Sequence, residues 1–329
     1  MITHYDKTPL SLYLLSDSLF FTMQYIVYIL FRMIIFLVSF FPFRLIYIIS
    51  DITFHLMYSV LKYRKKVVTD NLRKSFPEKS DEEIKKITIN FYHYLSDLFF
   101  ESLKGMTLSR AELEKRHKYI NPEIVNQYLA QERSILGVTA HYGNWEWGAF
   151  SGATQFNGEM VAFYKPMKNK IIDRYMVKHR ARFNCHLASI GETYYTFRHY
   201  RNQIVTYFMV SDQSPSNLRR SYWFNFLNQD TAFIHGPEDY SRLYNLPVIF
   251  IEIRRVKRGY YEVWFSLLAE NPNSLPSGEV TRLYAEKLES IIKKSPEQWL
   301  WSHRRWKRKR SDIRHRNLKK AEASHIEGN

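Results

Sequence analysis

The sequence predicts an α/β fold, with a largely parallel or mixed central sheet flanked by helices and an N-terminal membrane-associated helical segment. Three observations predict it: a long apolar run near the N-terminus, a helical stretch after it, and, from Ser134 onward, short β-prone runs that alternate with helical stretches. Strands that alternate with helices are typical of a layered α/β fold. At 329 residues the chain can hold one large domain or two small ones.

The apolar run extends from Leu19 to Phe41, and Arg32 is its only charged residue. Roughly 20 residues are enough for a helix to cross a bilayer. An arginine near the centre costs about 2.5–3.5 kcal/mol on insertion scales, which the many Ile, Leu and Phe residues offset. A second apolar stretch, 43–61, contains charged residues and reads as an interfacial or packed helix. Residues 1–61 are therefore predicted to be membrane-anchoring helices, which either cross the bilayer or lie in one leaflet. A buried core helix would show the same pattern.

Positive charge follows this apolar region, at residues 62–66 and at Arg73 and Lys74. Under the positive-inside rule, it places the rest of the chain in the cytoplasm, at the inner (cytoplasmic) membrane. The whole chain has a formal net charge of +16. Such a charge indicates an anionic partner or surface, which can be nucleic acid, phospholipid headgroups or an acidic protein.

Residues 62–130 read as a helical lead-in to the core. Ser80-Asp-Glu-Glu83 is a capping-box pattern, which predicts a helix that begins there and runs towards Leu103. Breaks are expected at Pro77 and at 106–109.

The predicted α/β core covers residues 131–310. Strands are expected at 135–140, 160–164, 204–210, 247–253 and 260–267, and helices at 170–182, 193–201, 237–244 and 280–294. Active sites of such sheets gather at the carboxyl ends of the strands, so residues that follow these runs are the first candidates. The basic stretch 311–329 reads as a solvated, flexible tail.

A five-residue step from His141 to Glu146 follows the first of these strands. On a continuous helix, residues five apart point about 140° away from each other. The two side chains can therefore meet only if His141 lies in the loop after the strand and Glu146 in the first helical turn. Gly143 and Asn144 supply that loop and an N-cap. A neutral imidazole held by a carboxylate is a general base for a hydroxyl, although a buried, satisfied histidine has the same spacing.

Other polar residues follow the same set of strands. Asp212 comes after the strand 204–210, and Lys165 follows the strand 160–164. Arg182, with Arg180 as its rival, could reach inward from a helix end. A turn-forming role for Asp212 and a surface position for the cations remain the alternatives.

The sequence contains no CxxC, HExxH or glycine-rich phosphate loop. A metal site built from His141, Glu146 and Asp212 matches no closed zinc pattern, so no metal or organic cofactor is expected. Cys185 is the single cysteine, which rules out an intrachain disulfide, and it reads as a small buried thiol rather than a nucleophile.

The segment 301–310 is densely basic and contains two tryptophans. It suits anionic headgroups or another anionic ligand. The common RNA-binding signatures are absent, and no nucleic-acid partner is expected. Arg304 and Arg305 follow the apolar segment 299–301, and we expect them to be ordered cations that contact substrate.

These residues together resemble a known family, the late acyltransferases of lipid A biosynthesis (the lauroyl/myristoyl acyltransferase family) of Gram-negative bacteria. The resemblance extends from the membrane segment to about Arg310, and its matching stretches are Tyr63–Pro77, His141-x4-Glu146, Tyr164-Lys-Pro166, Asp212-Gln213 and Pro296–Lys307. The first and last are distinctive, whereas His-x4-Glu also resembles a wider superfamily of glycerolipid acyltransferases.

The resemblance implies transfer of a fatty acyl chain from acyl-acyl-carrier protein to a hydroxyl of a lipid A precursor. His141 would be the catalytic base and Glu146 the residue that orients it. Asp212 and Arg182 would match an aspartate and an arginine that matter in the family. Lys165 and Asn144 would lie among the substrate-binding residues. The loop after Asp212-Gln213 lacks a glycine found in some members, which leaves acyl length and acceptor position open.

Other classes of function remain open at this point. One is a related acyltransferase that acts on another glycolipid or phospholipid, with coenzyme A as the carrier of the acyl group. Another is a non-catalytic, membrane-tethered protein that binds anionic ligands, and a third is a metal-dependent hydrolase.

Overall fold

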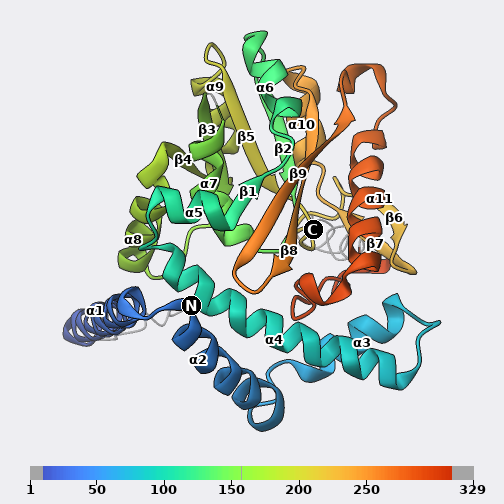
Figure 1. Ribbon diagram of the computed structural model, residues 1–329. Helices are drawn as coiled ribbons and strands as arrows, with labels where there is room; N and C mark the ends of the chain where they lie inside the picture. The colour runs from blue at the N-terminus through green and yellow to red at the C-terminus, as the bar shows by residue number, and fades with distance from the viewer. Residues whose placement is uncertain (1–9, 157, 313–329) are drawn as a thin grey trace, which may run out of the picture.

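A seven-stranded sheet with helices on both faces forms the centre of the molecule in the computed structural model, which describes residues 10–156 and 158–312 (Figure 1). Nearly all of the predicted tail 311–329 lies outside the described residues. The helices are α1 (Leu10–Phe40), α2 (Phe43–His55), α3 (Lys65–Ser75), α4 (Asp81–Gly105), α5 (Arg110–Arg116), α6 (Glu123–Ala130), α7 (Trp145–Gln155), α8 (Lys170–Arg180), α9 (Thr193–His199), α10 (Gly236–Leu243) and α11 (Glu279–Lys294). The strands are β1 (His117–Tyr119), β2 (Ile135–Thr139), β3 (Glu159–Tyr164), β4 (Cys185–Ser189), β5 (Val205–Val210), β6 (Tyr222–Phe226), β7 (Gln229–Phe233), β8 (Val248–Lys257) and β9 (Tyr260–Ala269).

The strand order of the large sheet is β1-β9-β8-β2-β5-β3-β4. Strands β8, β2, β5, β3 and β4 are parallel to one another, whereas β9 runs antiparallel to β8 and β1 pairs with β9. A mixed sheet flanked by helices confirms the predicted fold class. Since β2, β5 and β3 are adjacent and parallel, the residues that follow them meet at one edge.

Alternating side chains of the central strands feed two apolar clusters, one on each face of the sheet. In β8, Val248 and Phe250 belong to the first cluster, and Ile249 and Ile251 belong to the second. Helices α9 and α11 and the β6–β7 hairpin contribute to the first cluster, while α5, α6 and α7 contribute to the second. A strand that is covered on both faces reads as a continuous apolar run, which is why the central strands were predictable from the sequence.

Most of the predicted lead-in 62–130 is helical. Ser80 caps α4, because the Glu83 main-chain N–H donates to its hydroxyl at 3.3 Å while the Ser80 N–H donates to the Glu83 carboxylate at 2.9 Å. Helix α3 ends before Pro77, as expected. One element was missed: β1 within this stretch joins the large sheet beside β9, so the lead-in is not wholly helical.

The edge strand β4 and the β6–β7 hairpin were also missed. Both mix polar and apolar residues and lack the continuous apolar run of the central strands. The hairpin turns at Leu227 and Asn228, whose φ angles are both positive (51° and 60°), without the glycine that usually signals such a turn.

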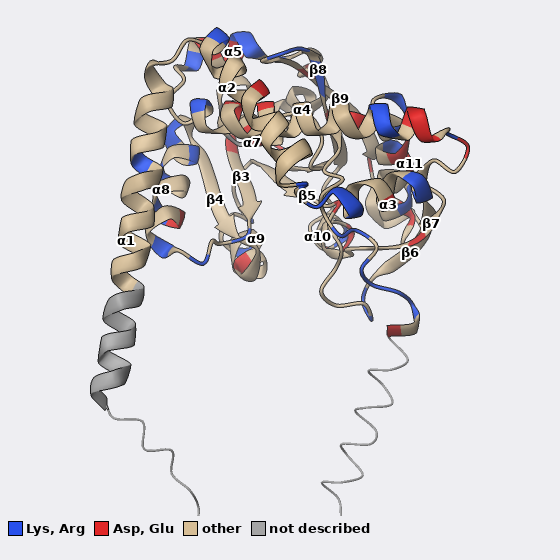
Figure 2. Ribbon diagram, turned by 90° about the horizontal axis from the view of Figure 1, so that it is seen from below, with Lys and Arg blue, Asp and Glu red and all other residues tan. Residues whose placement is uncertain are grey.

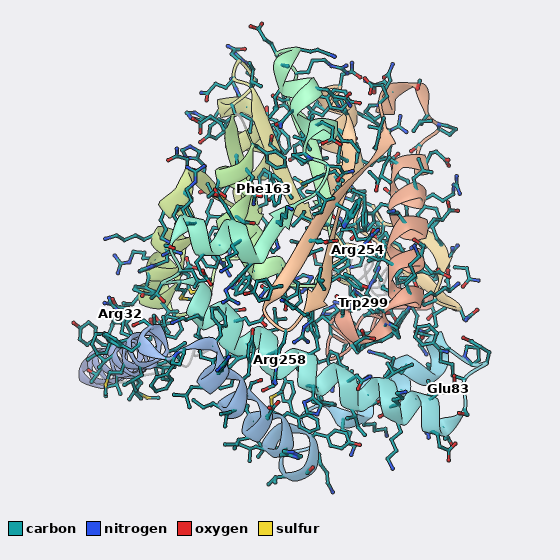
Figure 3. All side chains as sticks on the ribbon, viewed as in Figure 1. Arg32, Glu83, Phe163, Arg254, Arg258 and Trp299 are labelled. Atoms are coloured by element: carbon teal, nitrogen blue, oxygen red, sulfur yellow. The ribbon has the colours of Figure 1, made fainter. Side chains whose placement is uncertain are left out.

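Helix α1 contains a segment, Phe21–Phe40, that is long and apolar enough to cross a membrane. Helices α2 and α3 pass the same test only as a pair bent by 85°. Helix α2 packs on α4, and Arg258, in the turn between β8 and β9, joins the two helices: it pairs with Asp51 of α2 at 2.5 Å and with Asp97 of α4 at 2.6 Å (Figure 3). The charge at Asp51 in the second apolar stretch is therefore used for packing.

Candidate active site

His141 and Asp212 lie side by side at the carboxyl edge of the sheet, because they follow the parallel neighbours β2 and β5. Asp212 Oδ1 lies 2.6 Å from His141 Nδ1. The other carboxylate oxygen, Oδ2, accepts the main-chain N–H of His141 at 3.1 Å. The same aspartate therefore fixes both the backbone and the ring of the histidine. An imidazole whose Nδ1–H donates to a carboxylate leaves Nε2 free to accept a proton.

Burial makes this pair an electrostatic unit. The Asp212 side chain is only 3% exposed, and that of His141 is 19% exposed. Burial by itself lowers the pKa of His141, but the charge and hydrogen bond of Asp212 outweigh it, so the pKa of His141 is raised above its ordinary value. Burial opposes ionisation of Asp212, yet His141 and the indole N–H of Trp299 hold the pKa of Asp212 below its ordinary value. Asp212 is therefore ionised and ready to stabilise an imidazolium.

The loop after β2 is held by backbone contacts with a segment from the end of the chain. Gly143 donates its N–H to the Gln298 carbonyl at 3.2 Å, and Leu300 donates to the His141 carbonyl at 3.2 Å. Gly143 has a φ of +59°, and a Cβ there would lie 2.1 Å from the Ile253 carbonyl oxygen, so only glycine fits. The Gly143 amide is thus already paired within the protein.

Asn144 begins α7 as predicted, but its side chain is used within the protein. Its oxygen accepts the Trp147 main-chain N–H at 3.0 Å, and its amide donates to Glu101 of α4 at 2.8 Å. The residue is fully buried. This differs from the expectation that Asn144 contacts substrate. The side chain caps α7 and donates to the Glu101 carboxylate, and no part of it is exposed.

Glu146 lies in the first turn of α7, as the spacing predicted, but Nδ1 of His141 is taken by Asp212. The Glu146 carboxylate pairs with Arg180, at the end of α8, at 2.5 Å. Its negative charge still acts on His141 and contributes to the raised pKa of that histidine. The structure therefore replaces the expected Glu146–His141 contact by an Asp212–His141 contact, and Glu146 holds an arginine beside the histidine loop.

Of the two rival arginines, Arg180 joins the site through Glu146, and Arg182 turns elsewhere. Arg182 donates to the Gly105 carbonyl at 2.7 Å, and its guanidinium lies 4.7 Å from the ring centroid of Phe183. It thereby joins α4 to the end of α8, which is a packing role. Lys165 follows β3 at the same sheet edge as Asp212 and is exposed.

Trp299 and His303 were not among the predicted site residues, yet both support the His141–Asp212 pair. The Trp299 indole donates to Asp212 Oδ2 at 2.8 Å (Figure 3). His303 Nε2 accepts the Ser214 main-chain N–H at 3.3 Å, and burial lowers the pKa of His303 to about 4, so it stays a neutral acceptor. The signal that could have found them is the tryptophan-rich stretch 299–306, which lies within the distinctive last motif of the sequence.

The two distinctive motifs of the sequence lie against each other. Asn71, in the stretch 63–77, donates to the carbonyls of Trp301 and His303 at 2.9 and 3.1 Å. Arg64 donates to the Ser302 carbonyl at 3.0 Å. The first motif therefore fixes the last one, and the last one fixes the histidine loop.

Arg304 and Arg305, predicted as ordered cations that contact substrate, occupy opposite environments. Arg304 is exposed. Arg305 is 2% exposed, lies over the Phe233 ring at 4.7 Å, and has its pKa lowered to about 10 by burial. Its Nε and Nη2 have no hydrogen-bond partner among the described residues. Unlike Arg304, Arg305 therefore has almost no exposed surface to offer a substrate, because the turn after Trp301 points its side chain into the core.

The reactive nitrogen of His141 faces the exposed Gln213. The Gln213 side-chain amide lies 3.1 Å from Nε2. Since Nδ1 donates to Asp212, Nε2 accepts from this amide, and a substrate hydroxyl has to take its place. A buried carboxylate, an oriented imidazole and a partly exposed Nε2 are the parts of a general base.

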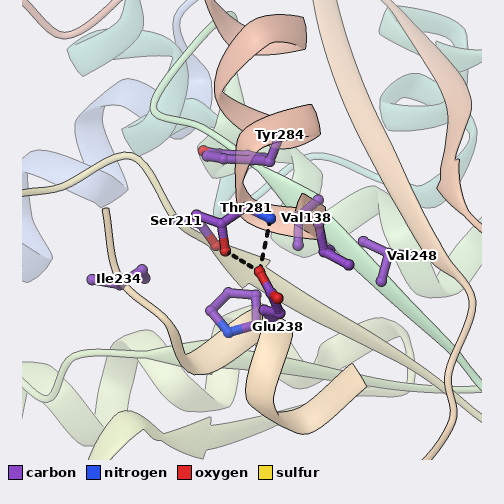
Figure 4. Close-up of a pocket in the computed structure, with 9 residues that line it drawn as sticks. Val138, Ser211, Ile234, Glu238, Val248, Thr281 and Tyr284 are labelled. Atoms are coloured by element: carbon purple, nitrogen blue, oxygen red, sulfur yellow. Dashed lines mark hydrogen bonds between the residues drawn. The ribbon is translucent and has the colours of Figure 1, made fainter. Parts of the chain in front are cut away.

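Two further features carry no free reactive group. The pocket in Figure 4 lies behind Ser211, between β2, β8, α10 and α11, and its buried Glu238 already accepts hydrogen bonds from Thr281 N and Oγ1 at 3.0 and 2.7 Å.

Cys185 is buried, and burial raises the pKa of its thiol to about 12. This buried position agrees with the prediction that Cys185 is a small buried thiol. Among the described residues, no group of three His, Cys, Asp or Glu side chains is placed to hold a metal ion.

Comparison with known proteins identifies the family. The model of the bacterial lipid A biosynthesis acyltransferases matches residues 16–308. The chain belongs to this family. It is 26% identical over 250 residues to the lipid A biosynthesis lauroyltransferase of Escherichia coli K12, a match that covers 75% of this chain and 80% of the relative.

Two more relatives show the same extent of similarity. The lipid A biosynthesis palmitoleoyltransferase of Escherichia coli K12 is 24% identical over 257 residues, which cover 75% of this chain and 80% of that protein. A lipid A biosynthesis acyltransferase of Haemophilus influenzae is 23% identical over 269 residues, with 80% and 82% covered. The protein is thus an acyltransferase. Membership of this family supports acyl transfer to lipid A, as the resemblance predicted. Its apolar α1 makes it a candidate for membrane association.

Proposed function

We propose that this enzyme transfers a fatty acyl chain from acyl-acyl-carrier protein to a hydroxyl of a lipid A precursor at the cytoplasmic face of the inner membrane, with His141 as the general base. The observation that carries the proposal is the 2.6 Å contact between His141 Nδ1 and the buried Asp212. It leaves Nε2 as the proton acceptor at the one edge of the sheet where β2, β5 and β3 all end.

The reaction needs no enzyme nucleophile. The acceptor hydroxyl donates its proton to His141 Nε2 as its oxygen attacks the thioester carbon, and Asp212 stabilises the imidazolium that forms. When the tetrahedral intermediate collapses, the carbon–sulfur bond breaks and the imidazolium returns the proton to the leaving thiolate. Gln213 moves aside for the hydroxyl, which is possible because its side chain is exposed.

The Glu146–Arg180 pair supplies the positive charge that the intermediate needs. Arg180 Nε is buried without a hydrogen-bond partner among the described residues, while the terminal nitrogen pairs with Glu146. A guanidinium fixed in this way can stabilise a developing oxyanion or hold a phosphate of the acceptor. In this proposal Glu146 is the residue that positions Arg180, and Arg180 takes the place of Arg182 as the cation of the site.

Charge supports an anionic donor and an anionic acceptor. Acyl carrier proteins are acidic and lipid A precursors carry phosphates, whereas the chain has a net charge of +16. Lys165 and Arg304 are exposed cations on the two segments that flank the Asp212 loop, one after β3 and one in the segment that packs on it. We propose that these two cations contact the anionic groups of one of the substrates.

The test is a transfer assay with purified full-length enzyme. It receives radiolabelled acyl-acyl-carrier protein or acyl-coenzyme A, with either a lipid A precursor or a phospholipid as acceptor, and mass spectrometry identifies the product. The proposal predicts product only with the carrier protein and the lipid A precursor, and none with His141→Ala. A product on a different glycolipid or phospholipid, or transfer from coenzyme A at equal rate, would point to a related acyltransferase instead.

A further inference from the structure

Helix α1 contacts the rest of the protein along one narrow stripe. The side chains that are buried or half-buried recur every three or four residues, at Gln24, Tyr28, Phe31, Ile35 and Val38. The other side chains between Phe21 and Phe40 are almost all large, apolar and exposed. A helix that is apolar nearly all round and buried on one stripe has hydrocarbon as the natural environment for its remaining surface.

Along the first part of this stripe α8 lies against α1, as the lengthwise view in Figure 2 shows. Asn169, the N-cap of α8, donates to the Gln24 carbonyl at 3.0 Å. One turn and a half further on, the Tyr175 ring packs edge-on against Tyr28 and Phe31, with centroid distances of 6.1 and 5.8 Å. The contact thus extends along the first half of the segment Phe21–Phe40.

Arg32, the one charge in the apolar run, takes part in this contact. Its guanidinium lies 4.7 Å from the Tyr175 ring centroid, and it donates to the Tyr28 hydroxyl at 3.0 Å. The arginine is therefore on the α8 side of α1, where both partners are polar-tipped aromatic rings.

The C-terminal end of α1 is fixed as well. Lys104 of α4 donates to the carbonyls of Val38, Ser39 and Phe41 at 3.2, 2.6 and 3.0 Å. These carbonyls lie at the end of α1 and just beyond it, where the regular hydrogen bonds of the helix stop. With Lys104 at one end and α8 along its side, α1 has a fixed direction relative to the catalytic domain.

The outer surface of α8 is incompatible with hydrocarbon. Lys170, Arg174 and Lys178 are exposed, and so is Lys168 in the irregular loop before the helix. If α1 crossed a bilayer in this docked position, α8 and that loop would lie beside it at membrane depth. Cations are costly there, and irregular backbone facing lipid does not occur in the hydrocarbon region.

We propose that α1 lies in the plane of the membrane, with its exposed apolar side in one leaflet and α8 above it at the level of the headgroups. The partner is an anionic bilayer surface, which the cations of α8 match in charge. Exposed apolar side chains also occur on α2 and on the π-helical segment Leu56–Val60 after it, at Ile48, Ile52 and Val60. The enzyme then enters one leaflet without crossing, and both ends of the chain lie on the same side.

The first experiment measures that topology in full-length protein with an N-terminal and a C-terminal epitope tag. Sealed inside-out vesicles of a Gram-negative host are treated with an impermeant protease, and detergent-opened vesicles serve as the control for tag accessibility. Both tags should be cleaved in sealed vesicles. Cleavage of the C-terminal tag with protection of the N-terminal tag would overturn the proposal.

The second experiment measures depth along α1. Single cysteines replace Met23, Leu30 and Leu37, which are all exposed, in a Cys185→Ser background, and carry nitroxide labels in the reconstituted protein. An in-plane helix gives the three labels the same depth, within about one side-chain length. A crossing helix instead gives a progression of about 1.5 Å per residue along its axis, and that result would refute the proposal.

A label at Lys178→Cys on α8 is the matched control. In the proposed arrangement it lies at the headgroup level and is shallower than all three α1 labels. A label there as deep as the one at Leu30 would place α8 in hydrocarbon and contradict the proposal. Neither experiment depends on the acyl donor or acceptor, so the proposed reaction can fail while this inference stands.

Discussion

The carboxylate of Asp212 bridges two side chains from distant parts of the chain: Oδ1 lies 2.6 Å from His141 Nδ1, and Oδ2 accepts the Trp299 indole N–H at 2.8 Å. The bridge uses both oxygens, so the carboxylate has a fixed orientation. Because Asp212 is already held in place, it does not have to reorient when His141 becomes protonated.

Replacing His141 by Ala should remove most of the transfer activity. General-base assistance is worth roughly 10²–10⁴ in rate, so a loss of that size is expected with the fold intact. Steady-state transfer by the purified variant measures it, and circular dichroism checks folding. Wild-type turnover by a folded His141→Ala enzyme would show that the base is another group.

Asp212→Asn should move the pH profile as well as lower the rate. The imidazole accepts a proton only when it is neutral, so activity falls on the acid side with the pKa of His141. In the wild type that pKa is raised by Asp212 against burial. Without the carboxylate charge, burial dominates and lowers the pKa of His141, so the acid limb should move to lower pH while the plateau falls. An unchanged acid limb with a lower plateau would mean that Asp212 acts only as a structural residue.

Glu146 and Arg180 should act as one unit. If Glu146 positions Arg180, then Glu146→Ala, Arg180→Ala and the double variant should lose similar amounts of activity, because each removes the same fixed cation. The loss should be smaller than that of His141→Ala. Arg182→Ala is the control, and it should affect thermal stability more than turnover. Additive losses in the double variant would contradict the paired role.

Arg304 and Arg305 should respond differently to charge reversal. Arg304→Glu should raise the Michaelis constant for an anionic substrate more than it lowers turnover, and added salt should weaken the wild type more than this variant. Arg305→Glu should instead destabilise the fold by about 3–5 kcal/mol, since it buries a carboxylate near Asp212. Arg305→Met keeps the contact with Phe233 and is the milder control. Thermal melting separates the two cases, and an unaltered melting temperature for Arg305→Glu would refute the burial argument.

A chain that begins at Phe43 should lose membrane association and also some activity on detergent-dispersed acceptor. Helix α1 supports α8 through Tyr175, and α8 ends at Arg180, so removal of α1 loosens the cation beside the histidine loop. Fractionation and a micellar assay measure the two effects. Residual membrane binding through α2 can be tested by adding Ile48→Glu and Ile52→Glu. Full micellar activity would mean that α1 serves only as an anchor.

The central elements were predictable because local sequence alone specifies them. The apolar strands β2, β5 and β8 are buried on both faces, and the capping box at Ser80 is satisfied within one turn. The positions of His141 and Asp212 at one edge followed from the same patterns, since parallel strands end together. Segments without such local signals, such as β1 and β4, were missed because their pairing depends on neighbours elsewhere in the chain.

Tertiary structure decided which carboxylate serves the histidine and which arginine is exposed. The sequence spacing predicted Glu146 as the partner of His141. In the sheet, however, β5 lies next to β2, so Asp212 after β5 is the residue that contacts His141 Nδ1. Likewise, Arg304 and Arg305 are adjacent in sequence, yet one faces solvent and the other a phenylalanine ring, since the direction of a turn is set by what packs around it. The sequence by itself determined the residue types, the strand ends and the apolar segments. Only the packing of strands and helices determined the partners, because contacts between distant residues depend on the order of elements in space.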